Sequence, residues 1–352
     1  MRRLAVFAYS FSAAAFLLVF LRPAMPVLLA VGGFLLVLGL FTIFLRGRSG
    51  AFRFLNCVLP GLALACFSFA LWNHMILRPA EQLTSENRHV EATVLDYPLP
   101  ASYGESLTVR IGRVKCRLYL DDASGLEPGQ RISLDAKLLL TEERTGEDYF
   151  LSAGIPLFAY GKGEAEIISR AGHAWLYFTA RIGKALRDNI RAAFDEDTAP
   201  FLTAILTGER SALKADGFFY SMMREAGVLH CIAVSGMHLS FLVSVLAVIL
   251  GRGKHSSLLC IPVILLFMAV TGFSPSVVRA GVMQLALCGS VLLNREYDNH
   301  TALAVSLAIL TALNPHATHN VGLLLSFLST LGILLFYESL FRSLFPVRRE
   351  PD

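Results

Sequence analysis

Residues 226–241 read Ala226-Gly-Val-Leu-His230-Cys-Ile-Ala-Val-Ser235-Gly-Met-His238-Leu-Ser-Phe241 and begin a long apolar stretch. The segment has the composition of a membrane span, yet it contains two histidines, two serines and two glycines. Hydrocarbon offers polar groups no hydrogen-bond partner, so an ionisable side chain inside a span marks a candidate functional site. The segment therefore predicts a membrane protein with a polar feature among its helices.

Apolar runs long enough to cross a bilayer recur on both sides of this segment. The chain is 55% hydrophobic and 16% charged, which is too apolar for a soluble protein of 352 residues. We expect three early spans and four late ones, with Thr301–Leu313 as a shorter additional candidate. The seven longer runs are Leu4–Leu21, Met25–Leu45, Phe54–Trp72, Val228–Leu250, Ser257–Phe273, Val277–Leu293 and Val321–Phe341.

The cations of the short loops predict the orientation of the chain. With the N-terminus in the cytoplasm, the inner loops hold most of the loop arginines and lysines, as the positive-inside rule requires. These are Arg2, Arg3, Arg46, Arg48, Arg53, Arg252, Lys254, Arg295, Arg342, Arg348 and Arg349. Residues 81–170 hold ten Lys/Arg and fifteen Asp/Glu, a net charge of −5 within a chain of +4. We therefore expect an acidic, extracytoplasmic domain inserted into a basic membrane protein.

Short alternating apolar segments predict five strands within residues 81–170. Turns rich in Gly, Pro and Asp separate them, and five short strands in about 90 residues suit a small closed barrel of the OB type. The predicted fold is thus a polytopic α-helical membrane protein with an inserted, OB-like β-barrel. The predicted regions are membrane helices over 1–80, the barrel over 81–170, an interfacial amphipathic helix within 171–198, a helix bundle over 199–345 and a charged tail over 346–352.

One predicted strand is a candidate nucleic-acid contact. If Val114, Cys116 and Leu118 face the barrel interior, the alternate side chains face outward. Three cations and one aromatic ring could then follow a phosphate backbone and stack a base. These residues are Arg113, Lys115, Arg117 and Tyr119. An ordinary solvated strand face is the alternative, because a domain of net negative charge repels phosphate.

Four motifs, in order, resemble the ComEC family of bacterial competence channels. They are the segment His230–Leu239, the segment Ala204–Ser211, the segment Gly272–Ala280, and Leu313-Asn-Pro315 followed by Asn320–Leu328. The resemblance implies a channel that brings a single DNA strand across the bacterial cytoplasmic membrane during transformation. It also implies an OB-like domain after the early spans. The expected partners are DNA, membrane lipids, a DNA receptor, a cytoplasmic ATP-driven motor and other copies of this chain.

The polar residues of these motifs are the predicted transport pathway, with close helix packing through small residues and serines as the alternative. Helix geometry, with a rise of about 1.5 Å per residue, gathers them in the outer half of the membrane. They are His230, Ser235, Gly236, His238, Arg279, Asn314 and Ser326. Arg279 could contact phosphates, reach the membrane surface, or pair with Glu225 or Asp216. His316 and His319 are expected in a solvated outer loop.

Catalysis is not expected. Longer family members often carry a metallo-β-lactamase-like domain, but the nine histidines here form no His-x-His-x-Asp-His cluster. Two histidines eight residues apart on a regular helix lie about 12 Å apart, too far for one zinc ion. The sequence has no phosphate-binding loop of the ATPase type, so no metal or cofactor is expected. Transport of a small anionic or lipid-linked substrate, or a non-conducting scaffold role, remain alternatives.

Overall fold

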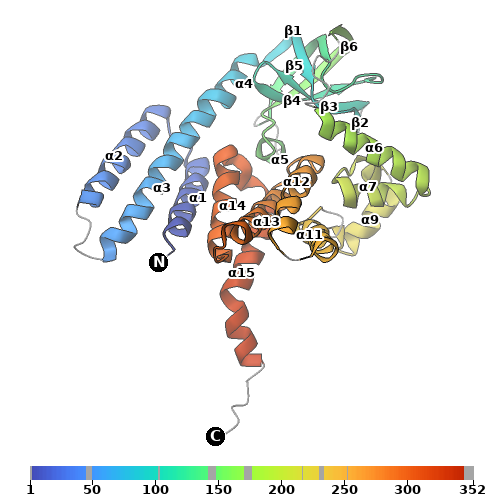
Figure 1. Ribbon diagram of the computed structural model, residues 1–352. Coiled ribbons are helices and arrows are strands. Elements are labelled where there is room, and N and C mark those ends of the chain that lie inside the picture. The colour runs from blue at the N-terminus through green and yellow to red at the C-terminus, as the bar shows by residue number, and fades with distance from the viewer. Residues whose placement is uncertain are drawn as a thin grey trace.

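The computed structural model describes residues 2–44, 50–101, 104–141, 148–169, 177–215, 217–229, 234–251 and 253–344. It consists of two groups of apolar helices and a small barrel that lies over one end of them (Figure 1). The expected fold class is confirmed: helices capable of spanning a membrane carry an inserted, OB-like β-barrel.

Three early helices form one group, as the hydropathy predicts. They are α1 (Arg3–Leu21), α2 (Met25–Phe44) and α3 (Gly50–Trp72). The α3 helix continues through a π-helical turn, η1 (Asn73–Leu77), into α4 (Arg78–Leu83). A continuous helix of 33 residues, Ala51–Leu83, is roughly 50 Å long, longer than a bilayer core of about 30 Å. The helix therefore acts as a strut that runs from the end of the molecule near the N-terminus up to the barrel (Figure 1).

The barrel closes through strands that are not neighbours in sequence. Its strands are β1 (Ser85–Val94), β2 (Leu99–Pro100), β3 (Glu105–Ile111), β4 (Val114–Leu120), β5 (Arg131–Leu140) and β6 (Leu157–Ser169). The order β1-β5-β6-β4-β3 is closed by pairing of β1 with β3, and β2 extends the edge of β3. Strands β4 and β6 are parallel, whereas the other pairs are antiparallel. This is a five-stranded closed barrel of the OB type.

The barrel interior is the alternating apolar set that the sequence predicts. Val90, Leu107, Cys116 and Ile132 are buried together with their strand neighbours. Burial raises the pKa of the Cys116 thiol, because the apolar core disfavours the thiolate. This thiol is therefore a small apolar filler of the core.

Short helices connect the barrel to the second group of membrane helices. Helix α5 (Asp148–Ser152) leaves the barrel between β5 and β6 and reaches down to the bundle (Figure 1). The predicted amphipathic helix is present as α6 (Phe178–Ala193) and contacts α7 (Ala199–Thr207) and α12 (Lys254–Val270). Further short helices follow: α8 (Ser211–Ala215) and α9 (Gly217–Glu225).

The late helices form the second group. The predicted first residue of one expected span is wrong. Helix α11 covers Gly236–Leu250 rather than Val228–Leu250, because Ser235 has extended backbone and caps the helix. The remaining helices are α12, α13 (Pro275–Leu293), α14 (Asn299–Leu313) and α15 (Val321–Leu344), with a 3₁₀ turn, η4 (Pro315–His319), between the last two. The shortest candidate, Thr301–Leu313, is largely buried as α14.

An ion pair shows which helix ends lie on the same side. Arg2 Nε lies 3.1 Å from Asp298 Oδ2, and Asp298 caps the start of α14. The N-terminus and the α13–α14 connection therefore share one side, and the barrel lies at the opposite end (Figure 1). Among the residues that the structure describes, four helices have the length and apolarity to span a bilayer, and four shorter apolar helices accompany them. The chain is a membrane protein.

We predict that Gly61→Ala lowers the stability of the early helix group. An added Cβ would lie 2.7 Å from the Phe7 carbonyl oxygen on α1 and would meet Ser10 as well. Close packing of small residues holds such helices together, so overpacking should cost about 1–3 kcal/mol. The measurement is thermal unfolding of the purified protein in detergent. Gly33→Ala is the matched control, because nothing lies within 4 Å of an added Cβ there. Equal midpoints for the two variants would contradict the packing.

Candidate functional site

Arg279 lies at the centre of the predicted pathway residues. It belongs to the second turn of α13 and is half-buried. Its Nε donates to Ser326 Oγ on α15 at 2.9 Å, and its Nη1 lies 3.6 Å from Met283 Sδ. Neither contact supplies negative charge. Within the described residues the guanidinium has no acidic partner, and Glu225, one of the acids considered for it, does not contact it. Asp216, the other, lies outside the described residues.

Gly236 brings α11 against this arginine. A Cβ on Gly236 would lie 2.8 Å from Ala280 Cβ and 3.3 Å from Arg279 Nη2. Only a glycine leaves room for the α11 backbone at this distance. Because Gly236 is the first residue of α11, the positive end of the helix lies beside the guanidinium. The N-terminus of α11 and the cation of α13 thus converge on one region.

Ser235 and His238 fix the start of α11. The Ser235 backbone N–H donates to His238 Nδ1 at 3.2 Å, and Ser235 Oγ accepts from the Met237 N–H at 3.3 Å. This reciprocal capping satisfies N–H groups that a helix start otherwise leaves unpaired. Because Nδ1 accepts, the neutral imidazole has its proton on Nε2. His230 lies outside the described residues.

Gln284 is a site residue that the sequence reasoning missed. Its Nε2 donates to Ser240 Oγ at 3.2 Å, which adds a second polar contact between α13 and α11. A glutamine inside an apolar run was the available signal. The structure thus brings together five of the predicted residues, and Gln284 extends the polar seam. These five are Ser235, Gly236, His238, Arg279 and Ser326.

Asn314 has contacts of a different kind. Its Nδ2 donates to the backbone oxygens of Leu151 and Ser152, both at 2.9 Å, and its Oδ1 accepts from the His316 N–H. A second asparagine, Asn320, donates to Ser152 Oγ at 3.4 Å. Asn314 therefore fastens α5 of the barrel to the α14–η4 corner. Its described contacts are with α5 and η4 and not with the region around Arg279.

The expectation of a solvated loop at His316 and His319 is wrong. His316 is 2% exposed, and its ring lies 4.6 Å from that of Trp72 at the end of α3. Neither ring nitrogen of His316 has a hydrogen-bond partner among the described residues. Burial, followed by the charges of His319 and Arg22, lowers the pKa of His316 from 6.5 to about 3. The η4 turn is a packed junction between the early helices, the late helices and α5.

The outward face of β4 is only partly free. Arg113, in the β3–β4 turn, and Lys115 are exposed as predicted. Arg117 instead donates to Ser106 Oγ at 2.7 Å and to Thr108 Oγ1 at 3.2 Å across the sheet. Burial lowers the pKa of Arg117. Tyr119 stacks on Tyr160 with ring centroids 5.3 Å apart. Two of the four predicted nucleic-acid contacts therefore have partners within the barrel.

This part of the barrel faces α6. Lys184 Nζ on α6 lies 4.6 Å from the ring centroid of Tyr97, which follows β1. The neighbouring Asp96 has a raised pKa because of burial, although the Tyr97 N–H, Arg187 and Arg117 oppose the rise. The β4 side of the barrel therefore faces the short helices.

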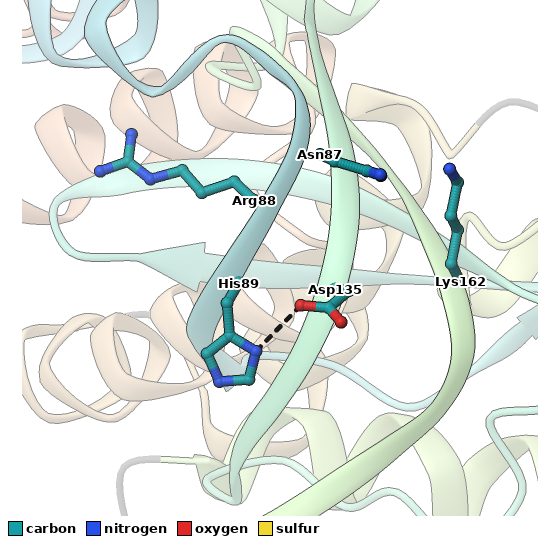
Figure 2. A pocket seen from close by; sticks show the side chains of 5 residues that line it. All are labelled: Asn87, Arg88, His89, Asp135 and Lys162. Carbon is teal, nitrogen blue, oxygen red and sulfur yellow. Dashed lines mark hydrogen bonds and ion pairs between the residues drawn. The ribbon is translucent and has the colours of Figure 1, made fainter.

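A groove of about 280 Å³ lies on another face of the barrel (Figure 2). It is lined by Asn87, Arg88, His89, Asp135 and Lys162. His89 lies 3.0 Å from Asp135 Oδ1 and 2.7 Å from Ser133 Oγ, the order of a Ser-His-Asp triad. Ser133 is 8% exposed and paired on both sides within the sheet, so its N–H cannot turn toward a substrate oxygen. These contacts form a cross-strand polar network.

The fold and the site define a class: a polytopic membrane protein with an OB-type barrel above a seam of polar helix contacts. Residues 205–352 match the family described as "Competence protein". A segment of 143 residues, 40% of this chain, is 27% identical to ComE operon protein 3 of Bacillus subtilis (strain 168). The late helical region of the chain is thus similar to competence proteins of the ComEC family. The match spans 18% of the length of that relative, and no solved structure matches.

We predict that Asn314→Ala loosens α5. Two backbone oxygens lose their donor, which costs about 1–3 kcal/mol when such groups are buried. Hydrogen exchange of the Gly154 and Ile155 amides should rise about tenfold, whereas that of β3 should not change. The same mass-spectrometric measurement on Asn299→Ala, at the exposed start of α14, is the control. Unchanged protection near Gly154 in Asn314→Ala would show that the asparagine does not hold α5.

We also predict that His316 makes the stability of the folded protein depend on pH. Its folded pKa of about 3 is below the unfolded value, so its contribution to stability is complete above pH 6.5 and falls as the pH decreases toward 3. From pH 7.5 to 5 the loss amounts to about 2 kcal/mol. Trp72 fluorescence during thermal unfolding reports this junction. His316→Phe should reduce the pH dependence, and the exposed His255→Phe should not. Equal pH dependence in all three proteins would contradict the assignment.

Proposed function

We propose that this chain is the membrane channel component that imports single-stranded DNA across the bacterial cytoplasmic membrane during natural transformation. Its similarity to a competence protein supports this role. The proposal assigns conduction and not catalysis to the chain. The barrel would lie outside the cytoplasm, and the N-terminus inside it, which agrees with the distribution of loop cations.

The observation that carries the proposal is the unpaired charge of Arg279. A half-buried guanidinium whose described partners are a hydroxyl and a thioether keeps its positive charge available. Phosphate groups are anions that the guanidinium fork binds well. A phosphodiester in transit would supply the missing negative charge, and the next phosphate would replace it as the strand moves.

The non-helical residues that precede α11 support the same proposal. Residues 226–228 and 234–235 are not helical, and α11 starts beside Arg279. Non-helical backbone at membrane depth is tolerated where it is buried in protein or lines a water-filled cavity. Broken helices whose N-termini point at anionic groups form substrate sites in transporters. The α11 N-terminus and Arg279 would together form an anion-selective constriction.

The barrel would receive the strand before it reaches this constriction. Its loops contact the bundle through α5 and α6, so the barrel lies directly above the late helices (Figure 1). Arg113 and Lys115 are the exposed cations of the predicted DNA-contacting face. DNA, lipids and other competence proteins are the proposed partners, including a receptor and an ATP-driven motor that would supply the driving force. Self-association is part of the same proposal.

We predict that Arg279→Lys abolishes most DNA uptake. A lysine retains the charge but has no guanidinium fork. It therefore cannot donate to Ser326 and at the same time bind a phosphate through two N–H groups. Loss of one charge-assisted contact of about 1.5–3 kcal/mol corresponds to a tenfold or larger decrease. The measurement is transformation with labelled DNA in a competent host whose own channel gene is replaced by this chain, with equal membrane levels verified.

Arg295→Lys, in the connection after α13, is the matched control and should transport normally. Normal uptake by Arg279→Lys would indicate that Arg279 only extends toward the membrane surface. No uptake by the unchanged chain, with the protein present in the membrane, would contradict the proposal that this chain conducts DNA.

A further inference from the structure

A small basic cavity lies at the opposite end of the early helices from the barrel. Its volume is about 170 Å³, and it lies between the start of α1, the end of α2 and the first turns of α3. It is lined by Arg3, Ile43, Arg53, Asn56 and Cys57. None of these residues belongs to the site around Arg279, and the proposed function assigns them no role.

The polar groups of this cavity are arranged to bind an anion. Arg3 and Arg53 are exposed, and neither guanidinium has a hydrogen-bond or ion-pair partner among the described residues, whereas the neighbouring Arg2 is paired with Asp298. Asn56 Oδ1 accepts from Thr42 Oγ1 at 2.6 Å, which leaves the Asn56 amide N–H groups as donors. Two cationic forks and an amide donor complement the oxygens of a phosphodiester.

The start of α1 adds positive potential at the cavity, and the end of α2, which contributes Ile43 to the lining, adds negative potential. Helix α1 begins at Arg3, and no side chain caps its first turn. The unpaired N–H groups of a helix start and its dipole favour negative charge. The described lining contains no acidic side chain, so no carboxylate in it compensates Arg3 and Arg53.

The surface around the cavity favours a lipid as the source of the anion. Ile43, Phe41 and Leu40 of α2 are 45%, 58% and 59% exposed, and Phe54 of α3 is 44% exposed. Acyl chains can lie along these apolar faces while the headgroup phosphate reaches the arginines. Basic pockets between membrane helices bind anionic lipid headgroups in this way.

We propose that the cavity between α1, α2 and α3 binds the headgroup of an anionic phospholipid through Arg3, Arg53 and Asn56. The lipid belongs to the leaflet on the side of the N-terminus. It ties three helix ends together and anchors the base of the strut that carries the barrel. The site does not depend on the transport of DNA, because it concerns only the membrane helices.

The test uses the full chain and its Arg3→Gln/Arg53→Gln variant in nanodiscs of phosphatidylcholine with or without phosphatidylglycerol. After extraction into a neutral detergent, native mass spectrometry counts the lipid that remains bound. Each cation near an anionic surface contributes about a factor of five, so the double variant should retain about 25-fold less phosphatidylglycerol. Lys254→Gln/Arg295→Gln removes two cations that lie outside the cavity lining, and this variant should retain as much lipid as the unchanged protein.

Thermal unfolding in pure phosphatidylcholine shows whether each variant is folded, and Arg3→Lys/Arg53→Lys serves as a second variant that keeps the charge. Intermediate retention by the lysine variant is the expected result. Equal retention by the glutamine variant and its control would overturn the site. Added inorganic phosphate should not raise the unfolding midpoint in phosphatidylcholine. If phosphate stabilises the protein as much as phosphatidylglycerol does, the site takes a soluble anion and the lipid proposal is wrong.

Discussion

A cation among apolar helices organises the late half of this chain. Arg279 needs hydrogen bonds and an opposing charge, since neither lipid nor apolar side chains can solvate a guanidinium. The protein supplies the hydrogen bond through Ser326 on α15, and Gly236 allows α11 to approach closely enough to enclose the group. The described residues do not supply the counter-charge. Three helices thus meet around a charge that no described acidic residue balances.

The second constraint concerns the connection of the barrel to the helices. A small barrel on a single strut would be free to tilt, because one helical connection fixes only one point. Asn314 and Asn320 supply a second point by binding α5, and the buried His316 packs the same corner against Trp72. The barrel is therefore attached at α4 and at α5. Movement at the η4 corner would be transmitted both to the barrel and to the start of α15, which carries Ser326.

Local periodicity predicted the elements, but not their junctions. The barrel strands were predictable because alternation of Val90, Ala92 and Val94 identifies their buried side. The start of α11 was not, since hydropathy is continuous through Ser235 and the capping depends on its contact with His238. Burial of His316 depends on Trp72, a residue distant in sequence. The pairing of Arg117 with Ser106 required knowledge of the register between β3 and β4. The deciding contact is local for Ser235 and His238 and tertiary for His316 and Arg117, and in neither kind of case does composition reveal it.

The non-helical residues before α11 are best understood together with the position of the barrel. A continuous span from Val228 would have satisfied its backbone internally and would have sealed the bundle against water. Instead, the helix begins at Gly236, with its positive end beside Arg279. The strut is about 20 Å longer than a bilayer core, so it can cross an apolar layer and still carry the barrel beyond one end of the helices. In the proposed function, the exposed cations of the barrel and the arginine that has no described acidic partner would both attract an anionic polymer.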